Sequence, residues 1–171
     1  MKVVVQRVTS AKVTVGESLI SSIGRGLCVL VGISRDDTPK DIEYIVRKIL
    51  NVRFFEGENK KRWSHSVKDK QFEILCVSQF TLCHMLKGNK LDFHHAMGPK
   101  DSEAFYNEFL NALQKSYEPH LIKDGKFGEY MQVSIVNDGP VTLHLESPST
   151  SKDKDSSQNL DDGEQVAGKI E

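Results

Sequence analysis

Two short polar segments are the places where this sequence could do chemistry. The first is Ser78-Gln79-Phe80-Thr81, which ends a strand-like apolar run. Its hydroxyls, its amide and any free backbone N–H groups could stabilise the negative charge that develops on a substrate carbonyl. A strand edge with outward-facing Ser and Thr is the other interpretation. As a nucleophile Thr81 is weak, because the sequence places no base beside it.

The second segment is Asn137-Asp138-Gly139-Pro140-Val141-Thr142. An ordinary β-turn explains it, because proline presets the backbone angle that such turns use. A cis Gly139–Pro140 peptide is the alternative, although only about 5–6% of X–Pro bonds in folded proteins are cis. The residues alone leave both interpretations open, and neither polar segment by itself decides a function.

A group of cysteines and histidines between residues 76 and 95 raises the question of a metal site. Its members are Cys76, Cys83, His84, His94 and His95. Adjacent pairs seldom direct both side chains to one ion, since neighbours in a strand face opposite ways. The sequence also contains no phosphate-binding glycine loop, no G-x-S-x-G motif and no paired-histidine zinc motif. We therefore expect neither a metal nor a cofactor.

The composition is that of a soluble globular chain. Its 171 residues fit one domain, and 38% are hydrophobic against 27% charged. A net charge of -1 argues against the wholesale coating of a polyanion but leaves a local basic patch open. No apolar run approaches the roughly 20 residues of a membrane span. The start of the chain is not typical of a signal peptide, so three cysteines favour reduced thiols in the cytosol or nucleus.

The C-terminal residues differ from the rest in charge. Residues 149–171 hold three lysines and six acidic residues, which gives -3 and leaves +2 for residues 1–148. They include no aromatic residue and few aliphatic ones, so they cannot bury enough surface to offset chain entropy. We expect one folded domain over residues 1–148 and a disordered acidic tail over residues 149–171.

The elements that must position the two polar segments are mostly strands. Runs rich in β-branched and apolar residues predict strands at 2–8, 12–15, 27–33, 52–55, 72–82, 126–136 and 141–146. The continuous apolar run 27–33 is typical of a strand buried on both faces. Between them we expect a polar loop or hairpin at 57–70 and a long surface loop at 84–101.

Two helices are predicted. The first has Thr38 as its cap, Pro39 at its first position and Asp41 three residues after the cap. The second is expected to begin at Ser102. Each carries an apolar stripe at helical spacing, formed by Ile42, Ile45, Val46, Ile49 and Leu50 in the first and by Phe105, Phe109, Ala112 and Leu113 in the second. Without regular βαβ alternation, this order predicts an α+β fold with a largely antiparallel sheet or open β-barrel and two main helices.

The two polar segments, taken together, carry a resemblance. The sequence resembles the D-aminoacyl-tRNA deacylase family, in its standard eukaryotic form, over essentially all of residues 1–148. Leu91 departs from the pattern, where the family has proline after KGNK. The matching stretches are MKVVVQRVTSAKVTV at the start, GRGLCVLVGIS (24–34), VSQFTL (77–82), KGNK (87–90), KFGEYMQV (126–133) and NDGPVT (137–142).

The resemblance implies a homodimer with two active sites at the subunit interface. Such enzymes hydrolyse the ester that joins a D-amino acid, or mischarged glycine, to the terminal ribose of tRNA. The substrate's own 2′-hydroxyl assists, and no metal or cofactor is implied. On this basis the ester is surrounded by four residues, namely Ser78, Gln79, Phe80 and Thr81. Their backbone N–H groups serve as the oxyanion donors. The resemblance also implies that a cis peptide between Gly139 and Pro140 reaches into the partner's pocket and rejects L-amino acids there. The neighbouring residues that support this peptide are Asn137, Asp138, Val141 and Thr142.

The partner implied is the acceptor end of an aminoacyl-tRNA. Candidate phosphate contacts are Lys87, Lys90, Lys123 and Lys126, although a solvated loop lysine is the favoured interpretation for any single one of them. An alternative function is DNA binding at replication origins, which relatives of this kind have been linked to through a C-terminal extension. A DNA-binding tail should be basic, so the charge of -3 ranks this role lower. We expect a cytoplasmic protein without membrane association, with a nuclear pool left open.

Overall fold

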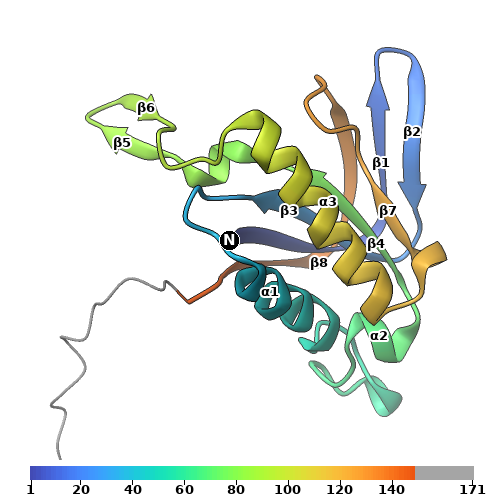
Figure 1. Cartoon of the computed structure of the whole chain (residues 1–171). Coiled ribbons are helices and arrows are strands. Elements are labelled where there is room, and N and C mark those ends of the chain that lie inside the picture. Colours follow the sequence, from blue (N-terminus) through green and yellow to red (C-terminus); the bar gives the residue numbers. More distant parts are fainter. Residues whose placement is uncertain (149–171) are drawn as a thin grey trace, which may run out of the picture.

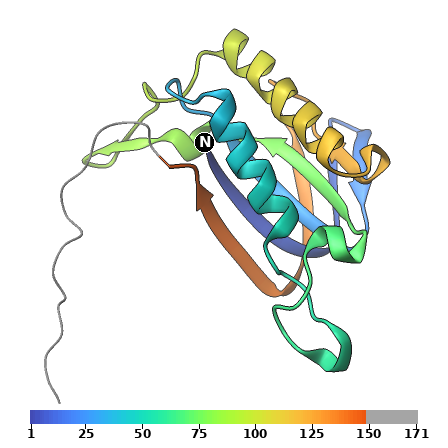
Figure 2. The same cartoon turned by 60° about the horizontal axis from the view of Figure 1, so that its bottom comes forward.

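The computed structural model describes residues 1–148, which form a curled sheet with helices packed against it. The strands are β1 (Lys2–Val15), β2 (Ser18–Ile23), β3 (Gly26–Gly32), β4 (Glu73–Ser78), β5 (Met85–Lys87), β6 (Lys90–Asp92), β7 (Ile122–Asp124) and β8 (Gln132–Glu146). The α-helices are α1 (Pro39–Asn51), α2 (Val67–Lys70) and α3 (Pro99–Ser116), and short 3₁₀ helices lie at Glu58–Lys60, Phe80–Cys83 and Pro119–Leu121. Helices α1 and α3 lie side by side on one face of the sheet (Figures 1 and 2).

The long strand β1 organises the sheet. It pairs antiparallel with β2, β3 and β8, and β8 follows it from the Thr14–Gln132 pair to the Lys2–Glu146 pair. The chain then crosses over through helices, so β4 is parallel to β3 and β7 is parallel to β4. The predicted α+β class, with an open barrel-like sheet and two main helices, is confirmed, and the β3–β4–β7 side adds a parallel part.

Hydrophobic clusters lie on both faces of the sheet. Successive residues of β3 and β4 alternate between them, as the pleat of a strand requires. Val29 and Cys76 belong to the larger cluster under α1 and α3, whereas Cys28 and Leu75 belong to a smaller one inside the curl. Strand β3 is therefore buried on both faces, as its continuous apolar run predicts.

The two main helices differ in how well their starts were predicted. Helix α1 begins with the expected capping box, in which the Thr38 backbone N–H and hydroxyl both bond Asp41 Oδ2 at 2.8 Å. Helix α3 begins at Pro99 with Gly98 as its cap, so the predicted start at Ser102 is wrong. Ser102 instead lies in the first turn, where its N–H donates to the Gly98 carbonyl at 2.8 Å.

Several strand boundaries also differ from the predictions. Residues 2–8 and 12–15 form one continuous strand, and the run 72–82 leaves the sheet after Ser78. Residues 52–55 are not a strand, because only an isolated bridge joins Phe55 to His65. The long loop 84–101 contains the small hairpin β5–β6. Within the described residues, no helix is both long and apolar enough to cross a membrane.

Candidate functional site

Residues Ser78 to Thr81 lie at the carboxyl end of β4, where the strand changes into a 3₁₀ helix. The Gln79 N–H still donates to the Val31 carbonyl at 2.7 Å, which extends the parallel ladder by one bond. The Gln79 side-chain amide turns back and donates to Thr81 Oγ1 at 2.6 Å. Within residues 1–148 the backbone N–H groups of Phe80 and Thr81 donate to no acceptor, so they remain available for a substrate oxygen.

A cavity of about 810 Å³ lies beside this segment. This volume falls within the range of small-molecule sites, which is roughly 300–1,000 Å³. Phe80 is 57% exposed, and its ring packs edge-on against Phe93 with the centroids 5.1 Å apart. The remaining walls come from the ends of β3 and β4, from the chain before and at the start of α3, and from the chain that enters β8, and they include Val31, Ile33, Val77, Ala96, Met97, Gly98, Pro99, Ser102, Phe127, Gly128, Glu129, Tyr130, Met131 and Val133.

The second polar segment forms a bulge in β8. Asn137 pairs with Val8 and Thr142 pairs with Gln6, so four residues of β8 stand opposite the single residue Arg7 of β1. The prediction of an ordinary turn between two strands is wrong, because both flanks pair with the same strand and the chain does not reverse. The Gly139–Pro140 peptide is cis, which is the alternative that the residues left open.

Arg7 holds this bulge, although the sequence did not mark it as a site residue. Its Nε donates to the Asp138 carbonyl at 3.1 Å and lies 3.4 Å from Asp138 Oδ2, while Nη1 donates to the Phe54 carbonyl at 2.6 Å. Gly139 has a φ of 118°, and a Cβ at this position would lie 3.1 Å from Arg7 Nη2. The only sequence signal was an arginine between Gln6 and Val8, within a run rich in valine.

Within one chain the two polar segments lie at opposite ends of the sheet. Ser78 pairs with Val31 at the carboxyl end of β4. Arg7, opposite the bulge, pairs with Leu27, which in turn pairs with Ile74 near the start of β4. Ile74 and Ser78 are about 13 Å apart along the strand at roughly 3.3 Å per residue. The structure therefore does not bring the two segments together in a single chain.

The four predicted phosphate contacts differ in how free their charges are. Lys87 is ion-paired with Asp92, and Lys126 lies 3.5 Å from Glu129. Hydrogen bonds from Lys87 and His94 hold the pKa of Asp92 well below its usual value. Two further lysines have no ion-pair partner within residues 1–148, namely Lys90, exposed in the β5–β6 hairpin, and Lys123, half-buried in β7.

The cysteines do not form a reactive site. Cys28, Cys76 and Cys83 are buried and unpaired. Burial raises the pKa of the Cys28 thiol to about 11 and also raises the pKa values of the other two, so all three stay protonated at neutral pH. Among the residues that the structure describes, no three His, Cys, Asp or Glu side chains gather as metal ligands.

Comparison with known proteins gives consistent matches across the part of the chain that the structure describes. The model of the D-Tyr-tRNA(Tyr) deacylase family matches residues 4–146. The chain is 68% identical to human D-aminoacyl-tRNA deacylase 1 over 148 residues, which cover 86% of this chain and 71% of the human protein. It is 60% identical to Drosophila melanogaster D-aminoacyl-tRNA deacylase over 161 residues, which cover 94% and 99% of the two chains. A solved structure named c-Myc DNA Unwinding Element Binding Protein superposes with a TM-score of 0.85 at 67% identity, covering 87% of this chain and all of the other.

Proposed function

The chain belongs to the D-Tyr-tRNA(Tyr) deacylase family and is a D-aminoacyl-tRNA deacylase, and on that premise we propose that it proofreads aminoacyl-tRNA by hydrolysing D-aminoacyl and mischarged glycyl esters. The observation that carries the proposal is the pair of free N–H groups at Phe80, which lines the 810 Å³ cavity, and at the adjacent Thr81. Such donors stabilise the oxyanion of an acyl-transfer reaction.

The proposed site is completed across a two-fold dimer. One chain keeps its Ser78 segment and its Gly139 bulge apart, whereas two copies can exchange them reciprocally. An interface to which each copy gives the same two pieces is isologous and closes as a dimer. Exposed apolar side chains on β8 support such a contact, since Val136 is 57% exposed and Leu143 is 37% exposed in the single chain.

In the proposed reaction, water attacks the ester carbonyl and the bond to the 3′-oxygen of the terminal ribose breaks. The backbone N–H groups of Phe80 and Thr81 hold the oxyanion, and the departing 3′-oxygen takes a proton. The substrate's vicinal 2′-hydroxyl assists the attack, so no side-chain base is required. The products are a free amino acid and a tRNA with an intact 3′-end, and the apolar cavity beside Phe80 receives the terminal adenosine.

Selection against L-amino acids is assigned to Gly139 and Pro140 of the partner copy, as the family resemblance implies. Steric rejection of the wrong hand can exceed what attractive contacts alone supply. Glycine carries no side chain to reject and should pass. A site that recognises the configuration at the α-carbon accepts many D-amino acids, because their side chains contribute little to recognition.

The decisive experiment compares D-tyrosyl-tRNA, L-tyrosyl-tRNA and mischarged glycyl-tRNA as substrates of the purified protein. We expect the D and glycyl esters to be cleaved and the L ester to be spared. Replacing Gly139 with a bulkier residue should impair cleavage of the D ester. Comparable rates for the D and L tyrosyl esters would overturn the proposed selectivity.

A second candidate function is binding to duplex DNA, which the name of the 67% identical solved structure suggests. Residues 149–171 lie outside the described part of the chain, and their charge of -3 opposes such binding. We place the protein in the cytoplasm for its deacylase role, with a nuclear pool only if it binds DNA. Salt-dependent DNA binding by the full chain and by residues 1–148 tests this, and loss of tight binding on truncation would favour the DNA role.

A further inference from the structure

The chain between α1 and β4 concentrates positive charge. Residues 53–70, here the basic loop, hold six basic and three acidic residues, a net +3 against the +2 of residues 1–148 as a whole. Its exposed Trp63 adds an aromatic face. None of the basic side chains has an ion-pair partner within residues 1–148, and they are Arg53, Lys60, Lys61, Arg62, Lys68 and Lys70.

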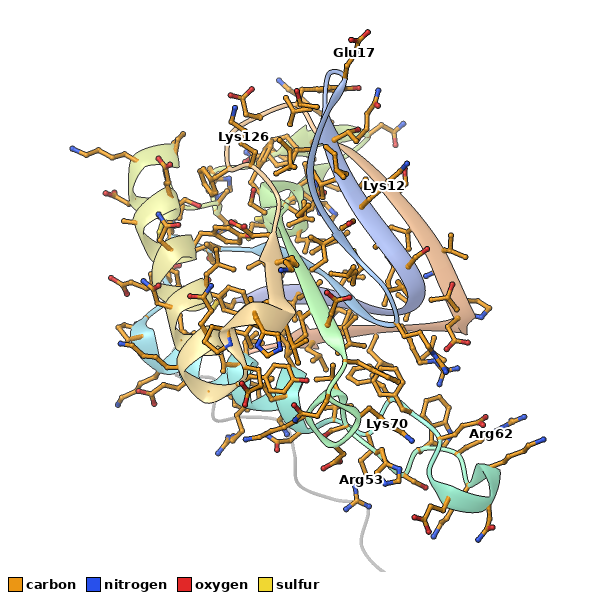
Figure 3. The ribbon with its side chains drawn as sticks, turned by 90° about the vertical axis from the view of Figure 1, so that its right-hand side faces the viewer. Lys12, Glu17, Arg53, Arg62, Lys70 and Lys126 are labelled. Atoms are coloured by element: carbon orange, nitrogen blue, oxygen red, sulfur yellow. The ribbon has the colours of Figure 1, made fainter. Side chains whose placement is uncertain are left out.

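The basic loop lies at the same end of the molecule as the Gly139 bulge. Arg7 joins the two directly, because it donates both to the Phe54 carbonyl in the loop and to the Asp138 carbonyl in the bulge. Arg25 adds a second connection, since its guanidinium lies 3.6 Å from Asp138 Oδ2 and 5.4 Å from the ring centroid of Phe72, just after the loop. Figure 3 shows Arg53, Arg62 and Lys70 together at this end, with Lys126 at the opposite one.

This placement excludes the loop from the chain's own active site. The loop leads into the start of β4, whereas Ser78 lies at the opposite end of that strand. Under the proposed function, however, the neighbouring bulge enters the site of the partner copy. The loop therefore flanks the partner's site and not its own.

We infer that the basic loop of each subunit binds phosphates of the tRNA acceptor stem whose terminal ester lies in the partner's active site. The inference rests on the proposed function and on its dimer. Unpaired, exposed cations on a loop contact phosphates without reading sequence, which suits an enzyme that must accept many tRNAs. Trp63 offers a stacking surface for an unpaired nucleotide near the single-stranded end.

The first test removes three charges from the loop in the full-length protein. The loop variant is Lys60→Gln, Lys61→Gln and Arg62→Gln, three exposed positions without ion pairs. The matched control changes three exposed helix positions, Lys40→Gln, Arg47→Gln and Lys115→Gln. Both variants are assayed on D-tyrosyl-tRNA over a range of salt and on D-tyrosyl-adenosine, which has the ester but no acceptor stem.

We expect the loop variant to lose about tenfold or more in kcat/KM on D-tyrosyl-tRNA at low salt. The slope of log(kcat/KM) against log[salt] should become shallower by about 2 to 3, because each duplex phosphate contact contributes roughly 0.9 to that slope. D-tyrosyl-adenosine should be cleaved at the wild-type rate, and the control variant should match the wild type on both substrates. Wild-type behaviour of the loop variant on tRNA, or an equal loss on the adenosine ester, overturns the inference.

A mixed dimer decides which site the loop serves. One subunit carries Ser78→Phe, which fills its own cavity and leaves one working site in the dimer. With the loop variant placed on the Ser78→Phe subunit, we expect tRNA cleavage to fall as in the loop-variant homodimer. With the loop variant placed on the other subunit, we expect the rate of a mixed dimer with intact loops. The reverse pattern overturns the assignment to the partner's site.

Two further outcomes separate this inference from the proposed function. If the wild-type protein cleaves neither D-tyrosyl-tRNA nor D-tyrosyl-adenosine, the proposed function itself fails. If the loop variant loses binding to duplex DNA but keeps full activity on D-tyrosyl-tRNA, the basic loop serves DNA and the inference about the acceptor stem is wrong.

Discussion

The Thr81 hydroxyl accepts a hydrogen bond from the Gln79 amide at 2.6 Å, and no carboxylate or imidazole within residues 1–148 bonds to it. A threonine hydroxyl without a base is a poor nucleophile. We therefore expect Thr81→Ala to keep deacylase activity within about tenfold, because the backbone donors survive the change. Single-turnover assays on D-tyrosyl-tRNA measure this, with Thr81→Ser as the control. A loss beyond roughly 10⁴-fold in a folded dimer would point to covalent catalysis through Thr81.

Under the proposed function Arg7 is a positioning residue, since it bonds the carbonyl and the carboxylate of Asp138 in the Gly139 bulge and ties them to the Phe54 carbonyl. We expect Arg7→Ala to lower the free energy of unfolding by about 1–3 kcal/mol, because it leaves half-buried acceptors unpaired. It should also reduce kcat on D-tyrosyl-tRNA more than Thr81→Ala does. Arg7→Lys should restore little, since an ammonium cannot reproduce the planar fork.

Urea unfolding and the ratio of D to L cleavage, measured on both Arg7 variants, separate positioning from stability. A merely structural residue would lower stability and leave that ratio unchanged. Full activity and unchanged selectivity in Arg7→Ala would show that the bulge keeps its place without Arg7.

The residues of the site were only partly accessible from the sequence. Ser78 to Thr81 and the Gly139 segment stand out because polar residues interrupt apolar runs. Arg7 does not, because its two carbonyl partners lie 47 and 131 residues away along the chain. Its role exists only once the sheet has brought these segments together.

Gly26 of β3 lies directly against the backbone of its β4 partner, Glu73. A Cβ there would lie 1.9 Å from the Glu73 carbonyl oxygen, whereas a Cβ at nearby Gly24 would meet only the Glu73 carboxylate at 3.6 Å. We expect Gly26→Ala to destabilise the protein by about 1–3 kcal/mol or more, since the backbone of β4 must shift. Gly24→Ala is the matched control and should change stability little. Thermal unfolding of both variants measures the difference, and equal effects would contradict it.

Elements with local signals were the ones that the sequence predicted well. Helix α1 follows from its capping box and apolar stripe, and β3 follows from its continuous apolar run. The single strand β8 could not be predicted, because only pairing with β1 on both sides of the bulge makes it continuous. The start of α3 was missed because Pro99 begins the helix three residues before the more familiar capping residue Ser102.

For the whole molecule, we expect a two-fold dimer that tolerates removal of residues 149–171. The fold closes before this segment, because the Ser147 N–H donates to the Met1 carbonyl at 2.9 Å and Ser147 Oγ bonds the N-terminal ammonium at 2.6 Å. Residues 149–171 include no aromatic and few aliphatic residues, and terminal segments of such composition are usually dispensable for folding. Sedimentation of the full chain and of residues 1–148 should show that both are dimers. Deacylation assays of the two proteins should give equal rates. A fully active monomer at assay concentration would contradict the shared site.

The separation of Ser78 and Gly139 within one chain has a consequence for inheritance. A copy damaged at Ser78 still lends an intact bulge, and a copy damaged at Gly139 still offers an intact Ser78 segment. In the proposed dimer each allele alone then encodes an inactive enzyme, yet a cell that expresses both should assemble mixed dimers with one sound site and one doubly damaged site. Two such alleles should therefore complement each other, although they are lesions in a single gene.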